Sequence, residues 1–352
     1  MKIAQIVPVE ETVPPQKYGG TELVASNLTE GLVARGHQVT LLAAGGSQTK
    51  ATLVPIFNQP IRALAPNPDD SKLREAYKYM AVAKAVDIVT NGDFDIVHNH
   101  IGWRVLPFEP LLKKAKVVTT LHGPLNVSYM QTVYGAYPSS RYISISNAQR
   151  QPMPNLNFVA TVYNGIDVKS FQFNEQPKGY AAFLGRMSPE KGPVQAIQAA
   201  KAAGINLVMA AKIDAVDQEY FAKEVKPLID DKQIKFIGEV DHAGKVALLK
   251  DAIALFALIQ WEEPFGLFMT EAMACGTPVI ATNFGSVPEL VQHGVNGYIV
   301  ANTPAAATQA VQALSLIKRQ DCRRIAEEKF SIDAMVAGYE AAYQSAISTP
   351  TG

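Results

Sequence analysis

The sequence predicts an α/β protein with two Rossmann-like domains, each built on a doubly wound parallel sheet. Its 352 residues exceed one ordinary domain and suffice for two that each bury a core. Short apolar segments alternate with helix-compatible segments through both halves, which is typical of strand–helix–strand units. A polar break rich in Asn, Pro and Gly at 164–179 separates the two series.

The first domain, which we place at residues 1–168, opens as a strand, a helix and a second strand. Apolar residues 2–9 precede a loop and a helix from about Glu22, in which Val24, Leu28 and Leu32 form one apolar stripe. The other expected elements are strands at 39–43, 96–98, 117–121 and 141–145 and a helix at 71–91.

The second domain, placed at 169–330, repeats the alternation. Its expected strands are 180–184, 207–211, 234–237, 254–258, 279–281 and 298–300. Helices at 305–316 and 332–345 follow the last strand. We expect the segment 331–352 to form a C-terminal helix that packs back on the first domain.

Composition excludes several classes of protein. Lys plus Arg equals Asp plus Glu at 32 each, so we expect no nucleic-acid partner. The two cysteines, Cys275 and Cys322, make neither a disulfide framework nor a metal cluster. No apolar run is long enough for a transmembrane segment, and no signal-peptide pattern opens the chain, so we expect a cytoplasmic protein.

The segment Gly-Arg-Met-Ser-Pro-Glu-Lys-Gly at 185–192 follows the first strand of the second domain and precedes a helix. Ligands of open α/β sheets bind beyond the carboxyl ends of the strands, where helix N-termini present free amides. Its glycines allow close backbone approach, and Arg186 and Lys191 supply two cations for a diphosphate. The alternative is an exposed turn with two ordinary surface charges.

Glu263 and Glu271 predict a second part of the same site. Glu263 lies in a loop after a strand, and Glu271 lies two helical turns further on, so both border one crevice. The amides of Phe265, Gly266 and Leu267 face that crevice, and a carboxylate there accepts hydrogen bonds from ribose or hexose hydroxyls. A helix start explains an acidic Glu263, but it does not explain Glu271 on an apolar helix, where an ionised group requires a partner.

Polar residues of the first domain give weaker indications. Gly19 and Gly20 precede the first helix, where backbone amides suit a phosphate or an acceptor, although glycine also serves turns alone. His98, His100 and His122 lie at strand ends without a further ligand at metal-binding spacing, so we interpret them as hydrogen-bonding residues.

An acidic pair before one strand matches the pattern of metal-dependent transferases only formally. Asp93 and Asp95 immediately precede the apolar strand that begins at Ile96. This is the end of the strand opposite to the expected site, so we interpret the pair as a turn and cap.

Taken together, these motifs resemble the retaining glycosyltransferases of family 4, the glycosyl transferases group 1, over nearly the whole chain. The motifs are Tyr18-Gly19-Gly20-Thr21-Glu22, Leu121-His122-Gly123, Asn164-Gly165-Ile166-Asp167, Gly185-Arg186 with Lys191-Gly192, the pair Glu263 and Glu271, and Gly285-Ser286-Val287-Pro288-Glu289. The resemblance implies the GT-B fold, in which the two Rossmann-like domains face a central cleft. It also implies that residues 1–168 form the acceptor-side domain and residues 169–330 the nucleotide-sugar-binding domain.

The resemblance also implies residue roles. Arg186 and Lys191 would hold the donor diphosphate, Glu271 the ribose and Glu263 a sugar hydroxyl near the reacting carbon. The remaining implied donor contacts are the amides of Phe265, Gly266 and Leu267, the base-contacting loop with Gly238 and Val240, and Gly20 of the first domain. His122 would line the reaction centre, and with Glu263 it would position the substrates and stabilise charge.

The implied reaction is a retaining, metal-independent transfer of a hexosyl group from a nucleotide diphosphate sugar, with UDP as the favoured nucleotide and no cofactor. Protein cations and helix-end amides replace a metal at the leaving diphosphate. The acceptor stays open between a small molecule, a glycan and a lipid. The alternatives are a nucleotide-sugar epimerase or hydrolase of the same architecture and a non-catalytic sugar-nucleotide-binding module. A nicotinamide dehydrogenase is excluded because no Gly-x-Gly-x-x-Gly follows the first strand.

Overall fold

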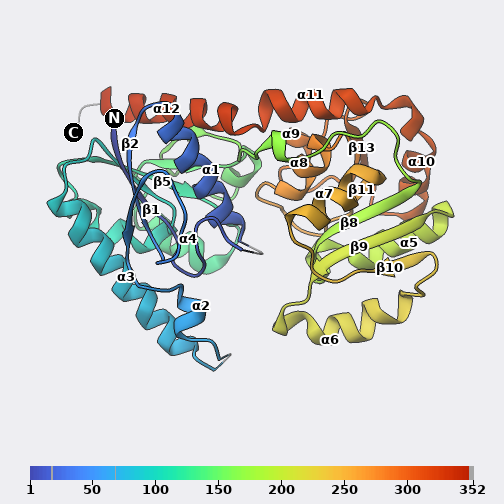
Figure 1. Cartoon of the computed structure of the whole chain (residues 1–352), viewed down its shortest axis with the longest axis horizontal. Helices are drawn as coiled ribbons and strands as arrows, with labels where there is room; N and C mark the ends of the chain where they lie inside the picture. Colours follow the sequence, from blue (N-terminus) through green and yellow to red (C-terminus); the bar gives the residue numbers. More distant parts are fainter. Residues whose placement is uncertain (17–18, 68, 349–352) are drawn as a thin grey trace. The chain divides into compact units, whose positions relative to one another are not determined.

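The computed structural model describes residues 1–16, 19–67 and 69–348. Two compact units result: unit 1 comprises Met1–Gly165 with the C-terminal segment from Ile332, and unit 2 comprises Ile166–Ser331. Each unit has its own parallel sheet with helices packed against it, as Figure 1 shows by label and colour. The predicted α/β class with two doubly wound parallel sheets is therefore confirmed.

Unit 1 is built on a sheet with the order β3-β2-β1-β4-β5-β6-β7, and each of its strand pairs is parallel. Its strands are β1 Lys2–Ile6, β2 Gln38–Ala43, β3 Thr52–Pro55, β4 Ile96–Asn99, β5 Lys116–Leu121, β6 Tyr142–Ser144 and β7 Phe158–Thr161. Its α-helices are α1 Gly20–Ala34, α2 Ile61–Leu64, α3 Ser71–Asn91, α4 Ser128–Gly135 and α12 Ile332–Ser348.

The sheet of unit 1 is wider than the sequence predicts, and its first helix begins earlier. The sheet continues beyond the expected strands to β3 and β7, which are short edge strands with partly exposed residues and therefore carry little apolar signal. The first helix begins at Gly20, two residues before the expected start.

The C-terminal helix α12 lies directly on α1. A Cβ atom built on Gly31 of α1 would lie 2.5 Å from Val336 of α12, so the two helices approach as closely as glycine permits. The hydroxyl groups of Tyr339 and Tyr343 lie in the interior of unit 1 and bond Thr120 and His98. α12 is thus part of the core of unit 1.

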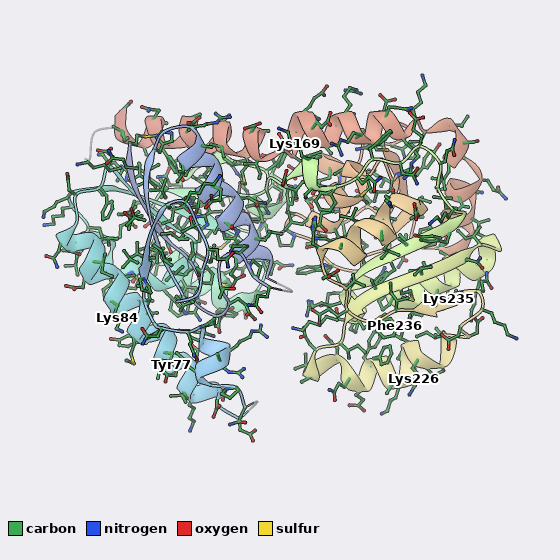
Figure 2. All side chains as sticks on the ribbon, viewed as in Figure 1. Tyr77, Lys84, Lys169, Lys226, Lys235 and Phe236 are labelled. Atoms are coloured by element: carbon green, nitrogen blue, oxygen red, sulfur yellow. The ribbon has the colours of Figure 1, made fainter. Side chains whose placement is uncertain are left out.

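α3 packs on one face of the unit 1 sheet. Tyr77 and Lys84 of α3, labelled in Figure 2, pack on Phe57, with ring centroids of Phe57 and Tyr77 5.3 Å apart and the Lys84 ammonium 4.7 Å from the Phe57 centroid. Apolar residues of α3 such as Val82 and Val86 join the same core as Ile6 and Val97 of the sheet.

Unit 2 is built on a parallel sheet with the order β10-β9-β8-β11-β12-β13. Its strands are β8 Tyr180–Arg186, β9 Asn206–Lys212, β10 Ile234–Phe236, β11 Ala252–Ala257, β12 Val279–Thr282 and β13 Gly297–Val300. Its α-helices are α5 Pro193–Ala203, α6 Gln218–Tyr220, α7 His242–Asp251, α8 Leu267–Ala274, α9 Val287–Leu290, α10 Pro304–Gln312 and α11 Arg319–Lys329.

A helix that the sequence pattern did not separate, α11, anchors the amino-terminal side of this sheet. Arg319 is nearly buried, and its guanidinium donates to the carbonyls of Asn174 at 2.5 Å, Ala252 at 2.8 Å and Lys250 at 2.9 Å. The guanidinium also donates to the Cys275 carbonyl and the Thr277 hydroxyl, so one side chain joins three chain segments. Over the described part of the chain, no helix combines the length and the apolar character required to cross a bilayer.

Candidate active site

The predicted anion loop of unit 2 lies at the carboxyl end of β8, next to the end of β11. Arg186 ends β8, a 3₁₀ turn spans Pro189–Lys191, and Gly192 precedes α5 with φ 70°. A Cβ atom on Gly192 would lie 1.9 Å from the carbonyl oxygen of Leu258, so another residue cannot occupy this position without moving the backbone. The close approach brings the preceding Lys191 next to the loop that follows β11.

Lys191 forms an ion pair with Glu263 inside this loop. The Nζ of Lys191 donates to Oε2 of Glu263, and Nε1 of Trp261 donates to the same oxygen at 3.1 Å. The ammonium also lies 5.0 Å from the ring centroid of Trp261 and 5.4 Å from that of Phe268. The side chains of Lys191 and Glu263 are 12% and 9% exposed, so aromatic rings and a carboxylate together hold the cation at the edge of the interior.

The backbone of the Glu263 loop is fixed by the motif that begins at Gly285. A Cβ atom on Gly285, which has φ 55°, would lie 2.3 Å from the Glu263 carbonyl oxygen. The amide of Ser286 donates to that oxygen at 2.9 Å, and Oγ of Ser286 donates to the Phe265 carbonyl at 2.5 Å. Gly285 and Ser286 therefore fix the backbone of the loop that carries Glu263.

Glu271 is buried and has the cationic partner that its apolar surroundings require. It lies on α8, and its Oε1 accepts a hydrogen bond from Nζ of Lys245 on α7. The two side chains are 6% and 19% exposed. Lys245 was not among the residues predicted from the sequence. No local pattern marks it, because it comes together with Glu271 only when α7 packs beside α8.

Arg186 is surrounded by carboxylates. Its guanidinium lies 2.5 Å from Glu190, 3.7 Å from Asp214 and 3.9 Å from Asp217. Burial raises the pKa of Asp217, and the nearby Arg186 opposes this rise. The sequence identified Arg186 as a cation but not the acidic cluster around it, so an anion must bind Arg186 in competition with these carboxylates.

Backbone groups complete the edge of unit 2. Gly266 precedes α8 with φ 88° and, as glycine, has no side chain to cap the amides of the first turn, including that of Leu267. The side chain of Phe265 packs in the interior against Phe330. Gly238 and Val240 lie between β10 and α7, where the Gly238 carbonyl accepts from the Ala211 amide at 2.9 Å. Unit 2 thus brings all its predicted donor-binding residues to the carboxyl ends of its strands.

Unit 1 carries the other two predicted residues. Gly20 is the first residue of α1, and a Cβ atom there would meet no described atom within 4 Å, so packing alone does not require glycine at this position. His122 follows β5, and its Nε2 lies 2.9 Å from Nδ1 of His100, which follows β4. Tyr18 of the same motif lies outside the described residues.

The predicted hydrogen-bonding role of the histidines is confirmed for His98 and extends to the C-terminal helix. Nε2 of His98 shares a hydrogen bond with the Thr120 hydroxyl at 2.7 Å. Nδ1 of His98 shares one with the Tyr343 hydroxyl, also at 2.7 Å. Burial lowers the pKa of His122 to about 4 and lowers the pKa of His98 and His100 well below the ordinary range. All three imidazoles are therefore neutral at pH 7.

The pair Asp93 and Asp95 lies at the amino-terminal end of β4, as expected. Asp93 pairs with the Lys2 ammonium at 2.5 Å, and Asp95 accepts from the Lys2 amide at 2.7 Å. Within residues 1–16, 19–67 and 69–348, no three His, Cys, Asp or Glu side chains are grouped as a metal ion would require.

The stability of unit 1 should depend on pH through these histidines. The folded state resists protonation, so the unfolded chain binds more protons between the ordinary pKa of 6.5 and the lowered value of about 4 for His122. The free energy of unfolding should be highest above pH 6.5 and should fall toward pH 4 by up to about 1.4 kcal/mol per pH unit for each such histidine.

Denaturant unfolding at several pH values, followed by Trp103 fluorescence in a Trp261→Phe background, measures this slope for unit 1. His122→Gln should flatten it by about one proton, whereas the exposed His293→Gln in unit 2 serves as the control. A slope that His122→Gln leaves unchanged would contradict the neutral, buried imidazole.

Family models match both halves of the chain. The model described as Glycosyltransferase Family 4 matches residues 18–170, and the model described as Glycosyl transferases group 1 matches residues 166–330. The N-acetyl-alpha-D-glucosaminyl L-malate synthase of Bacillus anthracis is 26% identical, over 92% of this chain and 93% of that protein. The phosphatidyl-myo-inositol mannosyltransferase of Mycobacterium leprae is 28% identical, over 89% of this chain and 87% of that protein.

Solved structures show the same fold. AviGT4, a glycosyltransferase involved in avilamycin A biosynthesis, has a TM-score of 0.74 and 24% identity, with 99% of this chain and 98% of that chain covered. Anabaena HepE in complex with UDP and glucose has a TM-score of 0.73 and 20% identity, with 98% of this chain and 100% of that chain covered. The two units therefore have the architecture of GT-B glycosyltransferases, and with both family models matched in order along residues 18–330, the chain belongs to the group 1 glycosyltransferases.

Proposed function

We propose that this protein transfers a hexosyl group from a nucleotide diphosphate sugar, with UDP as the favoured nucleotide, to a hydroxyl acceptor with retention and without a metal ion. The observation that carries the proposal is the two partly buried Lys–Glu ion pairs of unit 2, Lys191 with Glu263 and Lys245 with Glu271. HepE, solved with UDP and glucose, and the relatives named for glucosaminyl and mannosyl transfer support the donor class.

The leaving diphosphate would be held by protein groups alone. An ammonium has three donors, and the Lys191–Glu263 pair uses one of them, so Lys191 can bind phosphate oxygens without leaving Glu263. Arg186, the amide of Gly266 before α8 and the amide of Leu267 at its first position add donors and a partial positive charge. These fixed donors stabilise the charge that develops on the diphosphate as the glycosidic bond breaks.

The nucleoside would lie next to α7, beyond the residues that hold the diphosphate. Lys245 occupies Oε1 of Glu271, which leaves Oε2 to accept a ribose hydroxyl. The loop with Gly238 and Val240 leads into α7 and is the assigned base-contacting segment. The backbone there can hydrogen-bond a base edge without any side-chain requirement.

Glu263 and His122 would act at the sugar. Oε2 of Glu263 is fixed by Lys191 and Trp261, so Oε1 is the oxygen assigned to a sugar hydroxyl. His122 is neutral and supplies a hydrogen bond rather than a charge. In the proposed front-face reaction the C1–O bond to the diphosphate breaks, the acceptor oxygen bonds C1 from the same face, and the acceptor proton passes to the departing phosphate.

Chelation should leave turnover unchanged, because protein cations hold the diphosphate. We expect equal initial rates of donor consumption in buffer with excess EDTA and in buffer with magnesium, measured by phosphorus NMR. Loss of turnover in EDTA with recovery on adding magnesium or manganese would contradict the metal-free assignment.

The same reaction distinguishes transfer from hydrolysis and gives its stereochemistry. Proton NMR of the product should show the anomeric configuration of the donor. Donor breakdown at the same rate without an acceptor would favour the hydrolase alternative, and an inverted product would exclude the front-face reaction.

A further inference from the structure

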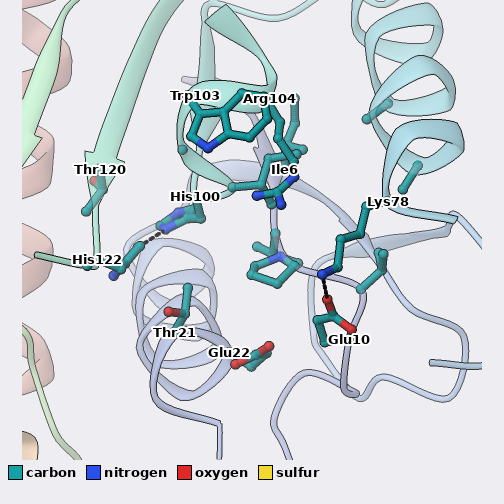
Figure 3. Close-up of a pocket in the computed structure, with 18 of the residues that line it drawn as sticks. Ile6, Glu10, Thr21, Glu22, Lys78, His100, Trp103, Arg104, Thr120 and His122 are labelled. Carbon is teal, nitrogen blue, oxygen red and sulfur yellow. Dashed lines mark hydrogen bonds and ion pairs between the residues drawn. The ribbon is translucent and has the colours of Figure 1, made fainter. Parts of the chain in front are cut away.

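A cavity of about 350 Å³ lies within unit 1 and is lined by residues of that unit. Figure 3 shows its polar groups: His100 and His122 lie on one side, Lys78 and Glu10 on the other, and Arg104 projects toward its interior. Its walls are apolar side chains of β1, α3 and the segment after β4. A pocket of this size with a few convergent polar groups is typical of a small-molecule site.

Arg104 is the least satisfied cation of this cavity. It ends the 3₁₀ turn Gly102–Arg104, and its guanidinium lies 4.8 Å from the ring centroid of Trp103. Its ion pair is with Glu75 at 3.7 Å, which is longer than a hydrogen bond, and the Glu75 side chain is 62% exposed. The planar fork of donors is thus held by stacking and remains available to an oxyanion.

Lys78 adds a second cation beside Arg104. Its ammonium lies 2.9 Å from Glu10 and 2.7 Å from Glu75, which uses two of its three donors. Because Lys78 neutralises Glu10, it offers a ligand its third donor rather than a net charge, and Arg104 supplies the charge for an oxyanion.

The opposite side of the cavity presents groups suited to hydroxyls. Nε2 of His100 is buried and has no hydrogen-bond partner among the described residues, which is costly for a polar atom that lines a cavity. Glu22, in the first turn of α1, is 7% exposed, and Figure 3 shows it across the cavity from Arg104. A ligand hydroxyl would satisfy both the imidazole and the carboxyl group.

We propose that this cavity binds the acceptor and that the acceptor is a small hydroxylated molecule carrying an oxyanion, either a carboxylate or a phosphate. Arg104, assisted by Lys78, holds the oxyanion, and the hydroxyls face His100, His122 and Glu22. The assignment to the acceptor rests on the proposed function, whereas the preference for an oxyanion rests on the cavity alone. The histidines are neutral, so the charge of the ligand is met at the Arg104 side.

The test uses matched probes that differ in one group. Glycerol, glycerate and glycerol 3-phosphate form one set, and glucose, glucuronate and glucose 6-phosphate form another. Their dissociation constants are measured by calorimetry on the whole protein, with UDP present to occupy the predicted anion site of unit 2. Arg104→Met and Arg104→Gln are compared with Arg324→Met, which removes an exposed arginine of α11 that pairs with Asp321 and Glu328.

We expect an anionic member of at least one set to bind the wild type about tenfold or more tightly than its neutral counterpart. The preference should disappear in both Arg104 variants and persist in Arg324→Met. The carboxylate and phosphate arms then identify the oxyanion.

Three results would overturn the proposal: equal binding of neutral and anionic probes, an anionic preference that survives both Arg104 variants, or no saturable binding of any anionic probe. UDP binding to the wild type is measured separately. UDP binding without an anionic preference removes the oxyanion from the proposal and leaves the proposed function. An Arg104-dependent preference without UDP binding contradicts UDP as the donor nucleotide and leaves an oxyanion site in the cavity that is no longer assigned to an acceptor.

Discussion

Replacing Lys191 by alanine is expected to lower kcat/KM roughly 10²- to 10³-fold, the usual effect of removing one fixed donor to the charge of a transition state. The change removes a cation assigned to the leaving diphosphate. It also leaves Glu263, 9% exposed in its side chain, without its counter-charge next to where that diphosphate would bind. Both effects act more strongly in the transition state, where negative charge accumulates on the phosphate oxygens, than in the bound substrate.

Three variants separate these contributions. Lys223→Ala removes an exposed lysine of unit 2 that pairs with Glu219 and should keep normal turnover. Adding Glu263→Gln to Lys191→Ala should restore part of the donor affinity, since it removes the stranded carboxylate, without restoring turnover. Near-normal kcat/KM in Lys191→Ala would remove Lys191 from the diphosphate site.

The Glu271→Ala protein should fold but bind the nucleoside diphosphate roughly 10- to 150-fold more weakly, because a charged acceptor of ribose hydroxyls is lost, a contribution of about 1.5 to 3 kcal/mol. The deletion also leaves the ammonium of Lys245 without its partner on α8. Affinity for UDP is measured by calorimetry, and thermal unfolding checks that the variant is folded.

Glu271→Gln and Lys245→Met refine this prediction. Glutamine keeps a neutral acceptor and should bind UDP with intermediate affinity, and Lys245→Met should weaken binding less than Glu271→Ala because the hydroxyl acceptor remains. Glu328→Ala, an exposed change on α11, is the control. Unchanged UDP affinity in Glu271→Ala would exclude the ribose assignment.

Much of the fold could be predicted because the central strands are continuous apolar segments. β1, β4, β5, β8, β11 and β12 are buried on both faces, and each begins or ends within a few residues of its expected bounds. β3 and β7 lie at the edges of the sheet, where their side chains are partly exposed and need not be apolar. β3 also ends in Pro55, which is unusual inside a strand. Tertiary pairing, rather than local pattern, makes them strands.

The site was predictable where one local segment carries it. Glu263 and Glu271 lie in a single loop and helix, so their spacing is readable in the sequence. Lys245 reaches Glu271 from another helix, and Asp214 reaches Arg186 from the loop after β9, so these contacts depend on how the elements pack. Trp261 stands two residues from Glu263, yet its role follows from the direction of its indole N–H, which sequence does not encode locally.

The cavity of unit 1 was missed for a related reason. Arg104 follows a strand that was identified, but it lies in a 3₁₀ turn without helical or strand periodicity. Its cation faces a cavity only because α1, α3 and the loop after β1 surround it. The histidines were singled out from their positions at strand ends, whereas the bond between His100 and His122 required β4 and β5 to be neighbours.

Donor recognition by unit 2 is tested most directly by titrating the whole protein, in EDTA, with a panel of UDP-, GDP-, ADP- and dTDP-sugars and recording thermal unfolding. Specific binding to the folded state increases the free energy of unfolding by mass action, by about 2.7 kcal/mol at a ligand concentration of 100 Kd, and Tm rises accordingly. We predict that at least one nucleotide sugar, with UDP-sugars foremost, raises the Tm of the wild type and has a much smaller effect on Glu271→Ala. A wild-type Tm that no member of the panel raises, or an increase that Glu271→Ala retains in full, would contradict donor binding at this site.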